Sequence, residues 1–137
     1  MKHKFSYLKT GLWYRPIIPV SLRHGKKEFS YLALLDSGAD FNIFHADIAD
    51  ILGIKLSKLK TMQFQGIKEG ASGKGYITEI EVGVNNNYQK TMVVFSRDIS
   101  ENGYGILGQQ GFFNNYEIKF LYKSKEIIVE TVSIGKN

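Results

Sequence analysis

The sequence predicts one mainly β domain with two short helices, and three observations support that prediction. The chain has 137 residues, 43% hydrophobic and 23% charged, which is typical of a single soluble globular domain with a sizeable core. Fourteen glycines and only two prolines accompany many aromatic and β-branched residues, a bias toward strands and turns. Short apolar or alternating segments are separated by clusters of glycine and asparagine. We expect one domain over residues 1–137, with its core at about 17–121 and a C-terminal hairpin reaching 132.

The first predicted element is a hairpin that leads into an aspartate. Residues 17–22 read as a strand with an edge or irregular start at Pro19. The segment 23–27 is a turn, and 28–36 is a second strand that ends at Asp36.

A short helix follows this hairpin. After the apolar stretch 41–44, residues 45–54 have helical spacing, and Gly53 supplies a C-terminal stop. We expect His45 at the surface or as a cap at the helix start. The apolar face of the helix would comprise Ile48, Ile51 and Leu52.

The second half of the chain reads as strands and one more helix. We expect a long hairpin, with strands at 61–66 and 76–84 and a glycine-rich tip at 66–75 between them. The remaining expected elements are a strand at 90–95, an apolar run with a short helix within 104–115, and a closing hairpin of strands 116–121 and 126–132.

The stretch "LALLDSGAD", residues 32–40, is the first candidate for chemistry. A carboxylate at a strand end is a general base if hydrogen-bond donors hold it, and glycine lets backbone amides approach. A second carboxylate about 3 Å away would share one proton with the first. Asp36 is therefore the candidate catalytic residue, in a loop formed by Ser37, Gly38 and Ala39. The alternative is an ordinary strand-to-turn connection.

Two further segments accompany this loop. "GILG", residues 105–108, offers aliphatics that would pack beneath the aspartate loop and a glycine for close passage, although it also fits a buried strand ending at a turn. The tip "GIKEGASGKG" at 66–75 is a lid over a site or a solvent-exposed hairpin. It is not a phosphate-binding Walker loop, because Gly75 follows the lysine and strands flank it on both sides.

The order of these segments resembles the retropepsin-like aspartic proteases, over roughly residues 17–121. The resemblance implies a single-lobe, closed acid-protease β-barrel with a flap hairpin, in which Asp36 is catalytic and Ser37 bonds across to a partner loop. It implies substrate binding by Gly38, Asp40, Gly66, Ile67, Gly70 and Ala71. It also implies support of the aspartate loop by Ile106, Leu107 and Gly108.

The sequence departs from the family at two points. Many relatives carry a basic residue after Ile-Leu-Gly that pairs with the acid at the Asp40 position, but here that residue is Gln109. Arg15, a partner chain or water would then hold Asp40. The chain is also longer at both ends than the minimal viral form, and chain termini often build the dimer interface in this family.

The function expected from the sequence is aspartic-type endopeptidase activity. The chain carries one Asp-Ser-Gly, so the second carboxylate would come from a second copy, in a homodimer that brings two Asp36 residues together. The alternative is a weak or inactive protease-like module that binds peptides.

Other classes have little support in the sequence. The chain has no cysteine, and its three histidines lie far apart, so we expect no metal and no cofactor. The net charge of +5 comes from scattered lysines, so we expect no nucleic acid as a partner. The N-terminus lacks the apolar core of a signal peptide, and no run reaches membrane-spanning length. A cytoplasmic protein without a membrane partner is the resulting expectation.

Overall fold

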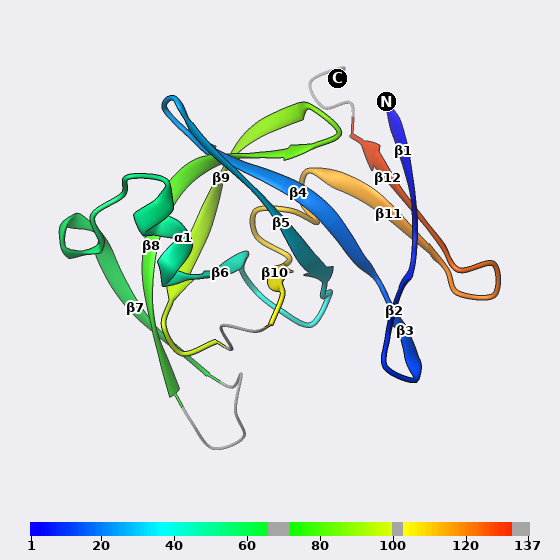
Figure 1. Ribbon diagram of the computed structural model, residues 1–137, viewed down its shortest axis with the longest axis horizontal. Helices are drawn as coiled ribbons and strands as arrows, with labels where there is room; N and C mark the ends of the chain where they lie inside the picture. Colours follow the sequence, from blue (N-terminus) through cyan, green and yellow to red (C-terminus); the bar gives the residue numbers. More distant parts are fainter. Residues whose placement is uncertain (66–71, 100–102, 133–137) are drawn as a thin grey trace.

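The computed structural model describes residues 1–65, 72–99 and 103–132 (Figure 1). Strands and turns dominate, as predicted. The strands are β1 (Lys2–Ser6), β2 (Leu8–Thr10), β3 (Trp13–Arg15), β4 (Ile17–His24), β5 (Lys27–Leu35), β6 (Ile43–His45), β7 (Lys60–Gln65), β8 (Ser72–Val84), β9 (Asn87–Ser96), β10 (Gly105–Leu107), β11 (Tyr116–Leu121) and β12 (Glu126–Thr131). The helices are α1 (Ala46–Ile51) and the single 3₁₀ turn η1 (Leu56–Lys58).

Six of the strands close into a barrel. Neighbouring strands follow the order β4-β5-β10-β6-β9-β8, and pairing of β8 with β4 completes the ring. Closure is possible because β8 is long: its first half pairs with β7, while Glu81 to Gly83 pair with β4. The closed barrel leaves fewer unpaired strand edges than an open sheet would.

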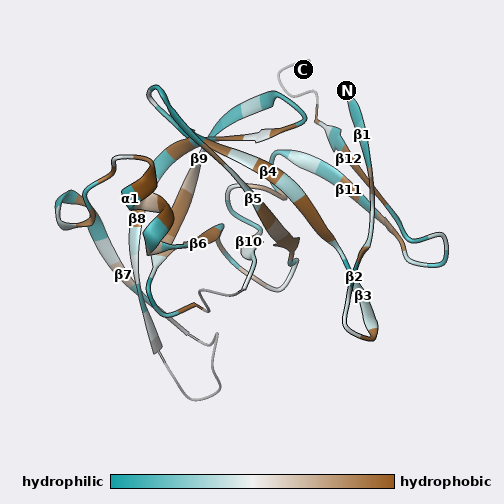
Figure 2. Cartoon of the chain, viewed as in Figure 1, coloured by the Kyte–Doolittle hydropathy of each residue, from teal (hydrophilic) through white to brown (hydrophobic). Residues whose placement is uncertain are grey.

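The barrel is filled by alternate side chains of its strands. Ile18, Val20 and Leu22 of β4 point inward and are almost fully buried, together with Phe44 and Phe95. Pro19 lies between them on the exposed face of β4. The pairing of β4 with β8 starts only at Ser21, so the missing N–H of Pro19 removes no hydrogen bond to β8. Figure 2 shows this pattern as hydrophobic stretches within the barrel strands.

A second, three-stranded sheet packs beside the barrel in the order β1-β12-β11 (Figure 1). The first and last strands of the described chain pair with each other, from Lys2 opposite Glu130 to Ser6 opposite Glu126. The sequence did not predict β1 or the small β2–β3 hairpin, whereas it did predict the β11–β12 hairpin. Ile127 and Val129 of β12 are fully buried and join this sheet to the main core.

Helix α1 has the expected ends but not the expected face. His45 is the N-cap, and its Nδ1 accepts a hydrogen bond from the Asp47 N–H at 3.1 Å. Gly53 follows the helix with a φ of +75°, the left-handed conformation that favours glycine. Ile48 and Leu52 are buried, but Ile51 is 47% exposed, so its assignment to the apolar face was wrong. The helix is short, and the three residues do not all turn toward the barrel.

The second helix does not lie where the sequence suggested. Residues 109–115 form successive turns, and the second helical element is η1 instead. Gly111, with a φ of +113°, interrupts any helix there. The Phe113 and Asn114 N–H groups donate to the carbonyls of Gly108 and Gln109, five residues back, rather than to the fourth. Phe112 is buried in the core.

Candidate functional site

Asp36 lies directly after β5, at the point where the barrel strand reaches solvent. Ala33 and Leu35 of that strand are buried, whereas Asp36 is half-exposed. Strand β10 runs parallel to β5, with Leu107 opposite Leu35. The Asp36 N–H continues this pairing by donating to the Leu107 carbonyl at 3.0 Å. The aspartate is therefore fixed at its backbone by the Ile-Leu-Gly strand.

The loop after Asp36 folds back on the carboxylate. The Gly38 N–H donates to Asp36 Oδ1 at 2.9 Å, and the Ala39 N–H donates to the Asp36 carbonyl at 3.1 Å. A Cβ atom at Gly38 would lie 3.2 Å from the same Oδ1, closer than most real contacts. Glycine thus permits the short approach of backbone to carboxylate. The loop orients one oxygen of Asp36 through a backbone donor and leaves the side chain accessible.

The turn after β10 holds the far side of this loop. The Gln109 N–H donates to the Ala39 carbonyl at 2.9 Å, and the Gln110 N–H donates to the Asp40 carbonyl at 2.8 Å. The Gln109 side chain adds a third bond, from Nε2 to the Ser37 carbonyl at 2.6 Å. Gln109 therefore supports the aspartate loop through its backbone and its amide, which the sequence alone did not reveal.

Gly108 is required for this close packing of two loops. A Cβ atom there would lie 2.4 Å from the Phe41 carbonyl oxygen and 2.8 Å from that of Ala39. Both atoms belong to the backbone and cannot rotate away as a side chain would. Of the three residues expected to support the loop, Leu107 and Gly108 are fully buried and contact it, while half-buried Ile106 pairs with Ile43 of β6.

Asn42 is a supporting residue that the sequence analysis missed. Its side chain has no solvent exposure. Its Oδ1 accepts from the Gly108 N–H at 3.0 Å, and its Nδ2 donates to the Met92 carbonyl at 3.1 Å. One buried amide thereby ties the β10 turn to β9 beneath the aspartate loop. The available signal was a single amide within the apolar stretch "FNIF", where a buried polar group needs partners.

Asp40 and Arg15 do not form the contact considered above. Asp40 is exposed, and its carboxylate has no ion-pair partner in residues 1–65, 72–99 and 103–132. The Arg15 Nε donates instead to the Thr10 hydroxyl at 3.1 Å.

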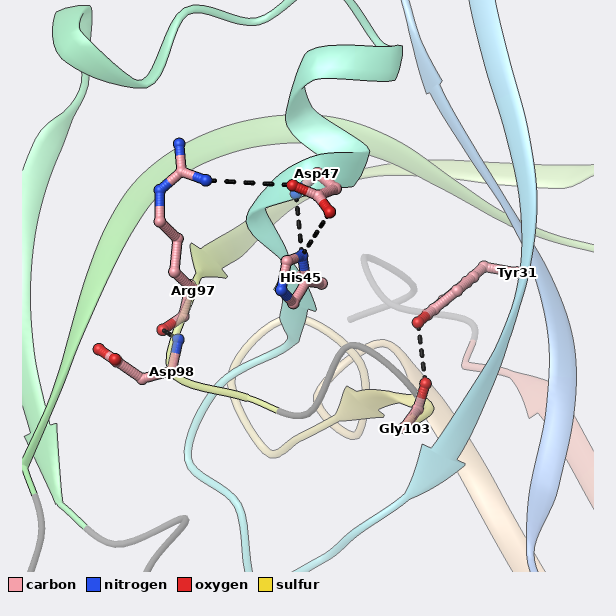
Figure 3. Close-up of polar contacts among 7 residues, drawn as sticks. Tyr31, His45, Asp47, Arg97, Asp98 and Gly103 are labelled. Carbon is pink, nitrogen blue, oxygen red and sulfur yellow. Dashed lines mark hydrogen bonds and ion pairs between the residues drawn. The ribbon is translucent and has the colours of Figure 1, made fainter.

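Two groups of polar contacts fix the elements around the site (Figure 3). The Tyr31 hydroxyl of β5 donates to the Gly103 carbonyl, just before β10, at 2.9 Å. Burial raises the pKa of this phenol, so it stays a donor at neutral pH. At the start of α1, His45 contacts Asp47, and the Asp47 carboxylate lies 4.0 Å from Arg97. These contacts restrain the approach to β10 and the helix that follows the site loop.

The hairpin of β7 and β8 has a well-fixed base. Its last described pairs are Phe64 with Gly73 and Gln65 with Ser72. Lys74 is bound on both sides: its N–H donates to Asp98 at 2.8 Å, and its carbonyl accepts from the Ser96 hydroxyl at 2.8 Å. The substrate-binding residues expected in the flap lie outside the described part of the chain: Gly66, Ile67, Gly70 and Ala71. Residues 72–75, also expected in the glycine-rich tip, instead form the start of β8.

The described residues show neither a cluster of three or more metal-ligating side chains nor a helix able to span a membrane.

Comparison with known proteins assigns the fold. No protein-family model matches the chain, and no curated protein is detectably similar in sequence. A retropepsin-like aspartic protease from Rickettsia conorii is similar in structure, with a TM-score of 0.63 and 14% identity over 94% of this chain and 91% of that one. The retroviral protease-like domain of Ddi1 from Leishmania major gives a TM-score of 0.54 and 14% identity, over 90% of this chain and 98% of that one.

EIAV protease complexed with the inhibitor HBY-793 is less similar in structure, with a TM-score of 0.48 and 20% identity over 74% of this chain and 88% of that one. The first two similarities are sufficient to establish the architecture. The chain has the single-lobe retropepsin-like fold, and the fold class predicted from the sequence is confirmed.

Proposed function

We propose that the protein is an aspartic endopeptidase whose active site combines Asp36 from two copies of the chain. The observation that carries the proposal is the bonding of the aspartate loop. Asp36 receives backbone hydrogen bonds through both its main chain and its side chain, in a loop clamped by the turn after β10. A carboxylate held this way by backbone donors, yet half-exposed, suits general acid–base chemistry.

The chemistry needs two such carboxylates. One takes a proton from water as the water oxygen attacks the carbonyl carbon of the peptide, while the other gives its proton to the carbonyl oxygen. Collapse of the resulting diol breaks the C–N bond as the amine nitrogen receives a proton. Asp40 is four residues from Asp36 and exposed, and its main chain is bound to the turn after β10. We therefore assign the second carboxylate to Asp36 of another copy.

The roles of Gly38 and Ser37 follow from position, and the other assignments from the family resemblance. Gly38 presents backbone beside the carboxylate, and Ser37 lies exposed next to it, free to bond to the partner loop. Asp40 would lie along the peptide groove, with Gly66, Ile67, Gly70 and Ala71 of the hairpin tip covering the bound peptide. The substrate is an extended peptide, and no metal or cofactor takes part.

The test is cleavage of a peptide mixture by purified wild type and Asp36→Asn. The amide keeps the shape of the side chain but cannot act as a base. We expect cleavage by the wild type, inhibition by a transition-state analogue of aspartic proteases, and a loss of roughly 10³-fold or more in Asp36→Asn. The matched control is Asp50→Asn, an exposed aspartate on α1, which should cleave like the wild type.

Unchanged thermal unfolding of Asp36→Asn would show that the loss is chemical. Equal cleavage by Asp36→Asn and wild type would refute the assignment. Peptide binding without cleavage by the wild type would instead identify the protein as a protease-like binding module.

A further inference from the structure

The β2–β3 hairpin exposes large apolar side chains to solvent. It forms a separate two-stranded sheet that extends away from the barrel, with hydrophobic residues at its turn (Figure 2). Leu12 is 84% exposed and Trp13 is 64% exposed, and Leu8 and Tyr14 are partly exposed on the same hairpin. A tryptophan and a leucine at a protruding tip are more typical of a contact surface than of a solvated turn.

The hairpin is held in one conformation. The Arg15 Nε donates to the Thr10 hydroxyl across the two strands at 3.1 Å. Gly11 has a φ of +64°, as the tight turn requires. The Lys125 ammonium lies 5.3 Å from the centre of the Tyr14 ring, which fastens the hairpin to the β11–β12 turn. Because the apolar tip is already ordered, its binding to a partner loses little conformational entropy.

The base of the hairpin adjoins the aspartate loop. Pro16, which follows β3 directly, accepts a hydrogen bond from the Leu35 N–H at 2.9 Å, and Leu35 precedes Asp36. A second copy that brings its own Asp36 against this loop therefore faces the base of the hairpin as well.

The terminal strands offer a weaker candidate interface. Strands β1 and β12 are paired with each other within one chain, with five residue pairs in register. Their hydrogen bonds on that side are already made, so they cannot exchange with a second copy there unless this pairing opens. The β2–β3 hairpin requires no such opening.

We infer that the β2–β3 hairpin is the arm by which a second copy of the chain docks, bringing the two Asp36 loops together. This inference rests on the proposed function, since it names the surface that completes the two-copy site. Leu12 and Trp13 are the anchors, and two-fold symmetry makes each arm pack against the other protomer.

The test compares the full-length wild type with the double variant Leu12→Ser and Trp13→Ser. Sedimentation over a range of protein concentrations gives the dimer dissociation constant, and peptide cleavage is measured over the same range. We expect the dissociation constant to rise at least about tenfold, because buried leucine and tryptophan anchors contribute strongly to binding. Specific activity should fall at low concentration and return to the wild-type value at high concentration.

Ile51→Ser is the matched control, because it removes an exposed apolar side chain from α1 and should leave the dissociation constant unchanged. Leu12→Lys is a second variant, which keeps Trp13 and should weaken dimerisation in the same direction. An unchanged dissociation constant in both arm variants would overturn the inference and leave the proposed function standing if the wild type is active. The inference would also be overturned if the wild type stays monomeric at every concentration. It would be overturned as well if the hairpin binds anionic vesicles and no second copy of the chain.

The two proposals fail differently. If dimerisation depends on the arm but the wild type cleaves no peptide, the proposed protease function is contradicted and the inferred interface stands. The same holds if Asp36→Asn cleaves as well as the wild type.

Discussion

The Asp36 loop and the Arg23–Glu81 pair place carboxylates on the same barrel in opposite ways. Arg23 of β4 lies opposite Glu81 of β8 and binds it through two N–H groups, at 3.0 and 3.2 Å. The Arg23 guanidinium also stacks 3.5 Å above the Tyr88 ring. Asp36, in contrast, has no cationic partner among the described residues, and its side chain accepts from a backbone N–H.

The Glu81 carboxylate joins two strands, whereas the Asp36 carboxylate stays accessible to solvent. Side chains alone satisfy Glu81, and each of its oxygens has a partner. Asp36 is positioned by main-chain atoms of two loops, and those loops depend on Asn42 and Gly108 beneath them. Substitutions under the Asp36 loop should therefore affect stability and activity together, whereas substitutions around Glu81 should affect stability alone.

The largest expected effect on stability is at Asn42. Asn42→Leu removes an acceptor for the Gly108 N–H and a donor to the Met92 carbonyl, both in the barrel interior. Leaving two buried groups unpaired should lower the free energy of unfolding by about 2–5 kcal/mol, measured by urea denaturation. Asn115→Leu is the comparison, because the side-chain bond of Asn115, to the Gly111 carbonyl, is longer at 3.3 Å and half-buried. A smaller loss at Asn42 than at Asn115 would contradict the role given to Asn42.

A smaller loss of stability, with a large loss of activity, is expected at Gly108. Gly108→Ala forces the Phe41 carbonyl away from its position and with it the aspartate loop. Overpacking of this kind costs about 1–3 kcal/mol, and the shifted loop should reduce peptide cleavage at least about tenfold.

Gly83→Ala tests whether this effect is specific to the site. A Cβ atom at position 83 would lie 2.7 Å from the Tyr88 ring. That ring belongs to a side chain remote from the aspartate loop. Gly83→Ala should destabilise the fold while leaving kcat near the wild-type value. Equal losses of kcat in the two glycine variants would remove the distinction between the two regions.

The smallest effect concerns pH and the Glu81 pair. The hydrogen bond from Arg23 holds the pKa of Glu81 below its ordinary value of 4.5. A carboxyl whose pKa is lowered by folding adds stability above its unfolded pKa, and this is lost as pH falls through the folded pKa. Glu81→Gln should therefore reduce the loss of stability seen below about pH 4.5, by a small amount because the pair is solvent-exposed.

Arg23→Gln should remove the same part of the acid dependence, and the double variant should remove no more than either single change. Additive effects of the two substitutions, measured by thermal unfolding between neutral and acidic pH, would show that the two residues act independently.

The sequence predicted the local parts of this structure and missed those that depend on distant partners. The β4–β5 hairpin, the strand ending at Asp36 and the cap at His45 have signals within a few residues. Strand β1 has none, because its partner β12 lies more than a hundred residues away and Lys2 and Lys4 obscure its apolar face.

The sequence located the motifs of the candidate site but missed part of its support. "DSGA" and "GILG" pointed to Asp36 and to the strand that binds it. The side-chain bond from Gln109 to Ser37 and the buried bonds of Asn42 depend on how two loops pack, which no local pattern encodes. The short helix expected within 104–115 failed for a related reason: Gly111, Asn114 and Asn115 favour turns. At the start of these turns, the N–H groups of Gln109 and Gln110 clamp the aspartate loop.

The central claim is that one active site needs Asp36 from two copies, and subunit mixing tests it most directly. Wild type is mixed with a threefold excess of Asp36→Asn under conditions in which subunits exchange, with exchange verified by mass spectrometry of labelled chains. With random pairing, only about one wild-type chain in four has a wild-type partner, so activity per wild-type chain should fall about fourfold. The same excess of wild-type-like Asp50→Asn should cause no fall. Activity per wild-type chain that stays constant after full exchange with Asp36→Asn would contradict the two-copy site.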